Sequence, residues 1–409
     1  MNILPSIVLF DTESNHTNLL PLSFTRPVCD FRIGITTIRQ KWEDCFQCAC
    51  AARPVEYLRA KFSTSEFAPS DTGDLLFIAG NTLPNGDLKY AIQQLESGQA
   101  LVDKAGDIVA FRGHESQLDA GDFRDVLQAP DCQRILYVFD IFLFNAEAIK
   151  TDFRRITKGR RSQPLPDSNR VIGPHADEDG LPLIFIEEGA SVEGATLNTT
   201  GGPIYIGGHA QVMEGACMRG PISLNHHSKI KMGAKIYGGT TFGPWCKIGG
   251  EVDNTVIFGY SNKAHDGYLG NAVIGEWCNL GAGVNSSNLK NDYSKIRVWN
   301  YASKSFMRTQ LQFCGLIMGD HSKAGINVMF NTATVVGVGC NIYGAGFPRV
   351  FIPSFSEGGA SGFTDVTLKK FYTIAERVMS RRGISLTSLD KRIYERVFEV
   401  ASSLKGGKR

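Results

Sequence analysis

The second half of the chain places a bulky apolar residue at every sixth position. A small or β-branched residue stands four places after nearly every one of them, as Ala210 follows Ile206 and Ala216 follows Val212. Neither the 3.6-residue repeat of an amphipathic helix nor the two-residue repeat of a strand gives this period. The uninterrupted run comprises Ile206, Val212, Met218, Leu224, Ile230, Ile236, Phe242 and Ile248.

A period of six is typical of a triangular solenoid, in which each face takes one hexapeptide and three faces make one turn. Stacked turns bury a continuous apolar column that no single repeat could bury alone. The register begins near Ile186 and returns from Met318 to Ile342. The sequence therefore predicts a left-handed parallel β-helix within residues 166–363.

The flanking segments have other patterns. Residues 1–165 alternate apolar, strand-like runs with helix-like segments, which predicts an α/β domain with a largely parallel sheet. Polar, turn-forming residues 158–169 are the predicted linker, and residues 364–409 form a predicted helical tail that packs on the β-helix end or on a neighbouring subunit. The predicted strands are Ile7–Phe10, Leu75–Ile78 and Ile135–Phe139; the predicted helices are Ile35–Trp42, Leu88–Leu95 and Ala146–Ile156.

Composition narrows the class of protein. The chain is 43% hydrophobic and 21% charged with a net charge of +2, which gives no electrostatic argument for nucleic acid or for an anionic membrane. We find no apolar stretch near the roughly 20 residues that span a bilayer, and the first residues lack the features of a signal peptide. We therefore expect a cytoplasmic protein. The cluster Cys45, Cys48 and Cys50 has no partner cluster at zinc-like spacing, so we interpret these residues as reduced thiols.

Two segments interrupt the six-residue register, Gly259–Tyr268 and Ser286–Tyr301. A solenoid accommodates insertions as loops that leave a corner, and such loops commonly form the binding face. The first segment contains His265, and a histidine that titrates near neutral pH is the natural base for deprotonating an amine or a hydroxyl. The alternative is an ordinary surface histidine. Lys263, Asp266 and Tyr268 accompany His265, and Asn279 and Asn288 follow in the next coils.

These residues resemble a known family. The runs GYSNKAHDGYLG (259–270) and AVIGEWCNLGAG (272–283), followed by Asn288, look like the acetyltransferase half of the bifunctional N-acetylglucosamine-1-phosphate uridylyltransferase/glucosamine-1-phosphate N-acetyltransferase family. The likeness is ungapped from His265 to Asn288 and reaches back to Glu251. The chain is most similar to a variant branch with a shortened, altered first domain, and the overall resemblance covers most of the chain.

The resemblance implies a role for each residue of this site. His265 would take a proton from a sugar amine as the amine attacks the thioester of acetyl-CoA, and Glu251 would orient the imidazole. Tyr268, Asn279 and Asn288 would contact the sugar phosphate, with Lys263 as a phosphate partner. The alternative for both asparagines is a structural role at the corners of the solenoid. The resemblance also implies a homotrimer that binds acetyl-CoA between neighbouring β-helices.

The N-terminal part resembles the Rossmann-like sugar nucleotidyltransferase domain of the same branch, through LLPLSFTRPV (19–28), Arg32-Ile-Gly34 and Lys41-Trp42. Arg26, Arg32 and Lys41 would neutralise the charge of a nucleoside triphosphate. The Gly-rich loop and the Pro-Lys motif of the standard enzymes are absent from this sequence. Asn81 stands where those enzymes keep an aspartate for Mg²⁺, and Asp140, after the predicted strand at 135–139, is the alternative Mg²⁺ ligand. Ordinary surface or ion-paired roles are the alternative for the three basic residues.

The leading hypothesis is a bifunctional transferase. The β-helix would acetylate an amino-sugar 1-phosphate such as glucosamine 1-phosphate, and the first domain would join a sugar 1-phosphate to a nucleoside triphosphate with release of pyrophosphate, for cell-envelope precursors such as UDP-N-acetylglucosamine. Two alternatives remain. The β-helix is only an oligomerisation and regulatory module of a nucleotidyltransferase, or the first domain is inactive and the β-helix acylates another sugar.

Overall fold

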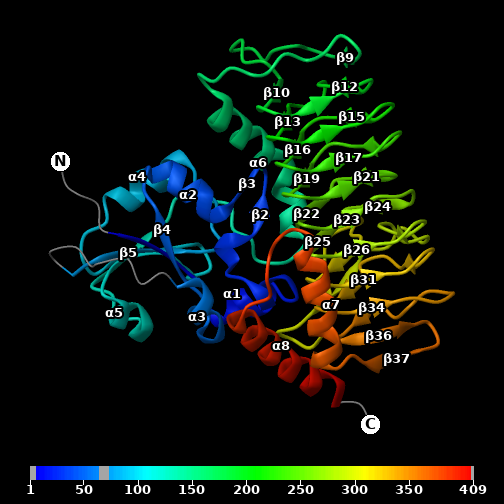
Figure 1. Cartoon of the computed structure of the whole chain (residues 1–409). Coiled ribbons are helices and arrows are strands. Elements are labelled where there is room, and N and C mark those ends of the chain that lie inside the picture. Colours follow the sequence, from blue (N-terminus) through cyan, green and yellow to red (C-terminus); the bar gives the residue numbers. More distant parts are fainter. Residues whose placement is uncertain (1–5, 64–72, 407–409) are drawn as a thin grey trace. The chain divides into compact units, whose positions relative to one another are not determined.

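The computed structural model describes residues 6–63 and 73–406 and divides the chain into two compact units (Figure 1). The first comprises residues 1–19, 25–31 and 36–136, and the second comprises 20–24, 32–35 and 137–409. The predicted boundary at residue 165 differs from this division, because the helix at 140–157 packs on the β-helix. Among the described residues, none of the helices has the length and hydropathy needed to cross a bilayer.

The first unit is an α/β sheet domain whose six strands follow the order β4-β1-β5-β7-β6-β8. β4, β1 and β5 run parallel, and β7 runs antiparallel to both of its neighbours. The strands are β1 (Ile7–Phe10), β4 (Cys50–Arg53), β5 (Leu75–Ala79), β6 (Gln99–Val102), β7 (Ile108–Gly113) and β8 (Asp125–Gln128). The helices are α1 (Glu13–Asn18), α2 (Ile38–Phe46), α3 (Glu56–Phe62), α4 (Gly86–Gln93) and α5 (Glu115–Ala120).

Local sequence explains where these helices begin. The Thr37 side chain accepts a hydrogen bond from the Gln40 N–H, and the Gln40 side chain reaches back to Thr37, so α2 begins after this capping box. Asn85 caps α4 in the same way. The predicted strand at Ile135–Phe139 is wrong: these residues lead into a turn, in which Asp140 Oδ2 accepts the Tyr137 N–H, before helix α6 (Asp140–Thr157).

The second unit is a left-handed parallel β-helix with three sheets. The first sheet holds β10 (Ile184–Ile186), β13 (Ile204–Ile206), β16 (Ile222–Leu224), β19 (Thr240–Phe242), β22 (Val256–Gly259), β25 (Val273–Glu276), β30 (Ile317–Met318), β33 (Val335–Val336) and β35 (Phe351–Ile352). The second holds β11 (Ser191–Val192), β14 (Gln211–Val212), β17 (Lys229–Ile230), β20 (Lys247–Ile248), β23 (Asn262–Lys263), β26 (Asn279–Leu280), β31 (Lys323–Ala324), β34 (Asn341–Ile342), β36 (Ser356–Gly359) and β37 (Gly362–Asp365). The third holds β9 (Arg170–Ile172), β12 (Thr196–Asn198), β15 (Cys217–Arg219), β18 (Lys235–Ile236), β21 (Glu251–Asp253) and β24 (Tyr268–Gly270), and β27 (Asn285–Ser286) pairs with β32 (Met329–Phe330) beyond it.

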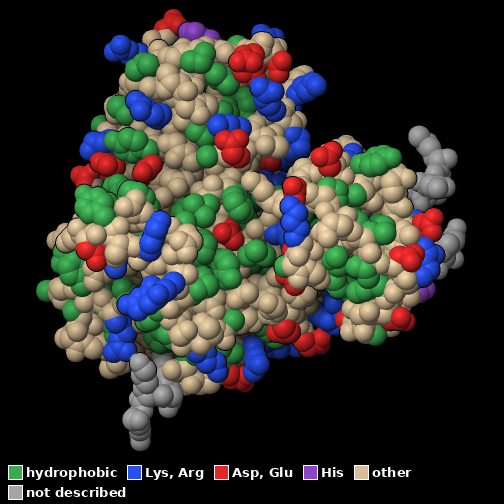
Figure 2. Space-filling model, turned by 180° about the vertical axis from the view of Figure 1, so that it is seen from behind, with side chains coloured by type: hydrophobic (Ala, Val, Ile, Leu, Met, Phe, Trp, Pro, Cys, Tyr) green, Lys and Arg blue, Asp and Glu red, His purple; other side chains and the backbone are tan. Residues whose placement is uncertain are grey.

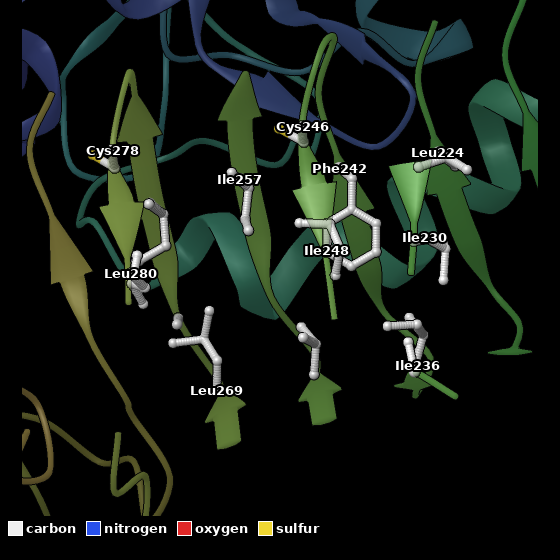
Figure 3. Close-up of a cluster of buried hydrophobic side chains, with 14 of the residues drawn as sticks. Leu224, Ile230, Ile236, Phe242, Cys246, Ile248, Ile257, Leu269, Cys278 and Leu280 are labelled. Carbon is white, nitrogen blue, oxygen red and sulfur yellow. The ribbon is translucent and has the colours of Figure 1, made fainter. Parts of the chain in front are cut away.

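The six-residue column forms the interior of this β-helix, as predicted. Ile230 pairs with Ile248 and Leu224 with Phe242 in adjacent coils, and all four are fully buried (Figure 3). Burying a side chain of this size contributes about 1.5–3 kcal/mol, and a stacked column repeats that gain in every coil. Charged side chains of both signs are interspersed with hydrophobic side chains over the face in Figure 2.

One corner of the β-helix carries a row of residues with positive φ, which we call the aromatic ladder. His227 stacks on Trp245 at 4.2 Å between ring centroids, and Tyr260 stacks on Trp277 at 4.3 Å. Side chains at positive φ cost conformational energy, and stacking in successive coils offsets part of it. The ladder consists of His209, His227, Trp245, Tyr260, Trp277, His321 and Phe355, with φ between 53° and 61°.

The tail helices α7 (Leu368–Ser380) and α8 (Ser388–Gly406) pack on this ladder, beside the last coils of the β-helix (Figure 1). At the coil between His321 and Phe355 the ladder position is Gly339, and the ring of Phe371 occupies the vacant space. A Cβ at Gly339 would lie 2.9 Å from that ring. The tail therefore docks on its own β-helix, one of the two arrangements that the sequence predicts.

Of the two predicted interruptions, only the second leaves the coil. After β27 the chain forms an antiparallel hairpin, β28 (Arg297–Asn300) and β29 (Ser305–Arg308), before it returns at β30. The prediction of an extruded loop at Gly259–Tyr268 is wrong: β23 and β24 continue the second and third sheets through this segment. His265 therefore lies on a corner of the regular coil.

Candidate functional site

His265 lies at the corner between β23 and β24, with an exposed side chain. The backbone of this corner is held from inside, because Lys263 Nζ donates to the His265 carbonyl O at 2.6 Å. The neighbouring coil closes against it at Gly250, which has φ of +71°, and a Cβ there would lie 2.9 Å from the same carbonyl O. The corner thus presents the imidazole on a fixed backbone.

Lys263 does not have the predicted role of a phosphate partner. Its side chain fills the interior column, where it pairs with Ile248 of the preceding coil, and the residue is 1% exposed. Burial lowers the pKa of its amine from 10.5 to about 8, against a smaller raising effect of Asp266. An interior amine cannot reach a substrate, so Lys263 acts on the site by fixing the His265 carbonyl.

Tyr268 and Asn288 do meet, as the resemblance implies. Asn288 Nδ2 donates to Tyr268 Oη at 3.0 Å and to Asn271 Oδ1 at 2.7 Å. Burial raises the pKa of Tyr268 to about 12, with Asp253 adding to the shift, so the phenol stays a neutral hydrogen-bonding group. The Tyr268 hydroxyl crosses Gly270, where a Cβ would collide with it. Asn271 and Asp253 were not among the sequence candidates.

Glu251 is a neighbour of Tyr268 and not of the imidazole. The two residues are register partners on β21 and β24, and the Glu251 carboxylate lies 3.9 Å from Lys235 Nζ. Within residues 6–63 and 73–406, the His265 ring makes no hydrogen bond to Glu251. The predicted orienting contact is therefore not found.

Asn279 lies apart from Tyr268 and Asn288, the other two residues predicted to contact the sugar phosphate. It belongs to β26 on the second sheet, where Asn262 Nδ2 donates to its Oδ1 at 3.4 Å. Tyr268 stands on the third sheet, around the corner from it. The site therefore has His265 at a corner, the Tyr268–Asn288 pair on one side and the Asn262–Asn279 pair on the other.

In the first unit, the chain goes from β1 out to β4 and then crosses to β5 on the other side of β1. Ligands of such sheets bind outside the carboxyl ends of the strands where the order reverses, here β1 and β5. Asp11 follows β1 directly and is buried there, with Oδ2 accepting the Val28 N–H at 3.1 Å. Among the described residues, its Oδ1 has no hydrogen-bond partner, and it faces Gly80, where a Cβ would lie 2.8 Å away.

Asp11 is a residue that the sequence reasoning missed. Burial raises the pKa of its carboxyl to about 7, with a further raising effect of Asp30 and a lowering effect of the Val28 N–H. A buried carboxyl at a switch point is a candidate for binding or catalysis. The signal was present in the sequence, because the aspartate comes directly after the apolar run Ile7–Phe10.

The predicted nucleotide-binding residues of this unit are buried and engaged in the protein. Asn81 follows β5, donates from Nδ2 to the Ile135 carbonyl O at 3.0 Å and accepts from Arg134 at 3.4 Å. Lys41 Nζ donates to Thr36 Oγ1 at 3.2 Å. Arg26 is 6% exposed in the segment 25–31 that carries Val28.

Two predicted residues fall outside the first unit. Arg32 belongs to the second, where it donates to the Phe258 carbonyl O at 3.2 Å and to Asn225 Oδ1 at 3.1 Å, and so fastens the segment 32–35 to the β-helix. Asp140 also belongs to the second unit, in the first turn of α6, where its Oδ2 accepts the Tyr137 N–H. The triphosphate contact of Arg32 and the Mg²⁺ ligation by Asp140 stay predictions.

The described part of the chain contains no cluster of three or more His, Cys, Asp or Glu residues that could hold a metal ion. A cavity of about 300 Å³ opens beside Asp11 at the ends of β1 and β4. Its acidic residues outnumber its basic ones, and Arg53 is already paired with Glu115 and Asp119, so the cavity does not suit a triphosphate.

The N-terminal part of the chain is similar to a known family. Residues 7–161 match the model of a family described as sugar nucleotidyl transferase. No curated protein matches the sequence. Among solved structures, the polySia-specific acetyltransferase NeuO is 13% identical, with 53% of this chain and 99% of that chain covered and a TM-score of 0.29. The UDP-N-acetylglucosamine acyltransferases of Francisella novicida and Bacteroides fragilis are 14% and 16% identical, cover 60% of this chain and 84% and 92% of theirs, with TM-scores of 0.28 and 0.24.

The match to the family model covers less than half of the chain, so it characterises the N-terminal part. Identities and TM-scores as low as those of the solved structures tell nothing about the substrate of this protein. Residues 7–161 are thus similar to the sugar nucleotidyl transferase family, and the second unit is a left-handed parallel β-helix.

Proposed function

We propose that the β-helix transfers an acetyl group from acetyl-CoA to the amine of an amino-sugar 1-phosphate, with glucosamine 1-phosphate as the first acceptor to test. The observation that carries this proposal is the exposed imidazole of His265 on a corner whose backbone is fixed by Lys263. An assembly module needs no presented imidazole.

In the proposed reaction the neutral imidazole of His265 accepts the proton that the amine loses as its nitrogen attacks the thioester carbonyl. A C–N bond forms, the C–S bond breaks, and the sulfur leaves as CoA thiolate, which takes up a proton. A positioned general base contributes about 100-fold or more to such a step. The Tyr268 hydroxyl and Asn288 amide, held together at 3.0 Å, supply neutral hydrogen bonds to the acceptor.

The test measures CoA release with glucosamine 1-phosphate as acceptor. We expect His265→Ala to lower kcat by about 100-fold or more, as the loss of a general base does. Activity of the parent enzyme should fall at acid pH as the base is protonated, and this acid limb of the profile should disappear in the variant. Unchanged CoA release in a folded His265→Ala protein would show that His265 is not the base, whereas no CoA release from the parent protein would leave the assembly-module alternative.

We propose nucleotidyl transfer as the activity of the first unit, and the family match at residues 7–161 is the observation that favours it. The substrate would be a nucleoside triphosphate supplied as its Mg²⁺ complex, whose α-phosphorus is attacked by a sugar 1-phosphate with loss of pyrophosphate. A panel of triphosphates and sugar 1-phosphates, assayed for pyrophosphate release, tests this activity. The absence of release across the panel would favour the alternative of an inactive first domain.

A further inference from the structure

Five basic side chains gather on one stretch of the second unit. Lys229 and Lys247 are register partners on adjacent strands β17 and β20 of the second sheet, and Lys231 follows β17. Arg381 and Arg382 come from the turn that ends α7. We call these five residues the basic patch: Lys229, Lys231, Lys247, Arg381 and Arg382.

The C-terminal end of α7 reaches the coil of Lys247 through a defined contact. The Arg382 guanidinium lies over the Trp245 ring at 5.5 Å from its centroid, and Trp245 is two residues before Lys247. Trp245 is itself fixed in the aromatic ladder by stacking on His227. Within the part of the chain that the structure describes, Arg382 Nε is buried without a hydrogen-bond partner. The two arginines are therefore held beside the sheet by packing rather than by neutralising charges.

The basic patch is not neutralised by the protein. Across residues 6–63 and 73–406, none of its five side chains forms an ion pair with an acidic residue. Burial lowers the pKa of Lys247, and the charges of Arg382, Arg381, Lys229 and Lys231 lower it further. Like charges held this close repel one another, and a bound polyanion removes the repulsion. Elsewhere on the β-helix, Lys235 has Glu251 at 3.9 Å.

Lys229 and Lys247 of the basic patch lie on the same sheet of the β-helix as the strand that precedes His265. Lys247 is the register partner of Asn262 on β23, the strand that leads directly into the His265 corner. A ligand anchored at Lys247 lies on the same sheet as that corner, one coil away. An elongated ligand with a phosphate-bearing end and a reactive end fits this arrangement.

We propose that the basic patch binds the diphosphate of a nucleotide-type ligand. Lysine and arginine bind phosphate oxygens through charge-assisted hydrogen bonds, and arginine does so with two parallel donors. Coenzyme A and a nucleotide sugar both carry this diphosphate. The choice of coenzyme A as the ligand rests on the proposed acyl transfer. The binding of a diphosphate by the patch rests only on its basic side chains and is independent of that proposal.

The experiment measures binding by calorimetry, with coenzyme A and UDP-N-acetylglucosamine as separate probes on the full-length protein. The double variant Lys247→Gln/Arg381→Gln removes two charges from the patch. We expect it to bind the recognised probe at least about tenfold more weakly, since each charge-assisted hydrogen bond contributes about 1.5 kcal/mol or more. Lys247→Arg keeps the charge and is expected to keep the affinity.

The matched control is Lys369→Gln/Arg377→Gln, which removes two exposed charges from α7 outside the patch. It is expected to bind like the parent protein, and equal thermal unfolding of both double variants shows that the fold is intact. Loss confined to coenzyme A identifies the acyl donor, and loss confined to UDP-N-acetylglucosamine identifies a nucleotide sugar; both support the site. Equal affinities in the two double variants, or no binding of either probe to the parent, overturn it.

The proposed function fails separately from this inference. Binding is measured without turnover, so it is expected to persist in His265→Ala whether or not that imidazole is the base. A protein that binds coenzyme A through the patch but releases none from acetyl-CoA would keep the phosphate site and refute acyl transfer.

Discussion

Lys263 puts an ionisable amine into a column of apolar side chains. Its folded pKa of about 8 lies below the ordinary 10.5, so between these values the unfolded chain binds more protons than the folded one. The free energy of unfolding therefore rises with pH across this window, by about 3 kcal/mol for a shift of this size. Burial also lowers the pKa of Lys323 to about 8, so we predict that the rise measured by denaturant unfolding is smaller by about 3 kcal/mol in Lys263→Met, not absent.

The same variant separates stability from function. Lys263→Met removes the hydrogen bond to the His265 carbonyl O, so we expect kcat for CoA release to fall while the KM for acetyl-CoA changes little. The matched control is Lys323→Met, because burial also lowers the pKa of Lys323 to about 8 but its amine binds the Trp277 and His321 carbonyls. Equal losses of kcat in both variants would contradict a specific role for Lys263.

Asp11 gives a pH dependence of the opposite sign. Its folded pKa of about 7 lies above the ordinary 3.8, so the stability that it contributes is fully present below pH 4 and is lost as the pH rises through 7. Asn preserves the acceptor for the Val28 N–H without the buried charge. We predict that Asp11→Asn is more stable than the parent at pH 8, by up to about 4 kcal/mol, and equally stable near pH 3.

Unfolding curves of the two proteins measured from pH 3 to pH 8 check this prediction. Parallel pH dependences would show that Asp11 is not protonated in the folded state below pH 7. Pyrophosphate release in the same variant then reports whether the carboxyl at the switch point takes part in catalysis, since the fold is stabilised and not lost.

For single residues, the sequence predicts which ones lie near the site better than it predicts whether their side chains face the solvent or the interior. Ile230 and Ile248 pair 18 positions apart, but Ile248 and Lys263 pair only 15 apart, because the coil between them lacks three residues. A strict six-residue spacing therefore predicts that Lys263 lies in a loop, although its side chain lies in the interior column of the β-helix. Asp11 was missed because its burial depends on the segment that supplies the Val28 N–H, which lies 17 residues away.

At the scale of elements, α7 is anchored by one ring in a gap of the aromatic ladder. Phe371 is 3% exposed and makes edge contacts with His321, Phe355 and Tyr394. We predict that Phe371→Ala destabilises the docking of α7 and α8 by about 3–5 kcal/mol, as expected for a large buried aromatic ring. Hydrogen exchange is expected to rise in residues 368–404 and to stay unchanged in the column around Ile230.

Gly339→Ala tests the same contact from the β-helix. Its Cβ would press on the Phe371 ring, and alanine is strained at a φ of +67°. It should loosen the tail as well. Thr373→Ala, at an exposed position of the same helix, is the control that should exchange like the parent. Rapid exchange of the tail already in the parent protein would contradict the docking.

Elements with a strong period were predicted well, and those defined by tertiary contacts were not. The β-helix column, the strand at Ile7–Phe10 and α4 all follow from local pattern and capping. Asp140 was assigned to the end of a strand because Ile135–Phe139 is apolar, whereas those residues form the turn before α6. Apolar runs of this length are compatible with either structure until their packing is known.

At the scale of the whole molecule, the homotrimer that the resemblance implies makes a prediction about the third sheet. This face has a groove of about 380 Å³ with exposed Ile172 and Tyr237 in its lining, which is unfavourable in water. We expect light scattering to give a mass about three times the 44.8 kDa of one chain. Ile172→Glu, in the first strand of this sheet and several coils from His265, should shift the mass toward that of one chain.

Because the acyl donor would lie between neighbouring β-helices, the same variant should lose CoA release although its His265 corner is intact. Tyr90→Glu introduces the same charge at a side chain that is 67% exposed in the first unit, and it should change neither mass nor activity. Full CoA release from an Ile172→Glu protein with the mass of one chain would mean that the His265 corner, with Tyr268 and Asn288, is complete within one β-helix. In that case the acyl donor must bind on the sheets of the same chain, where the basic patch lies.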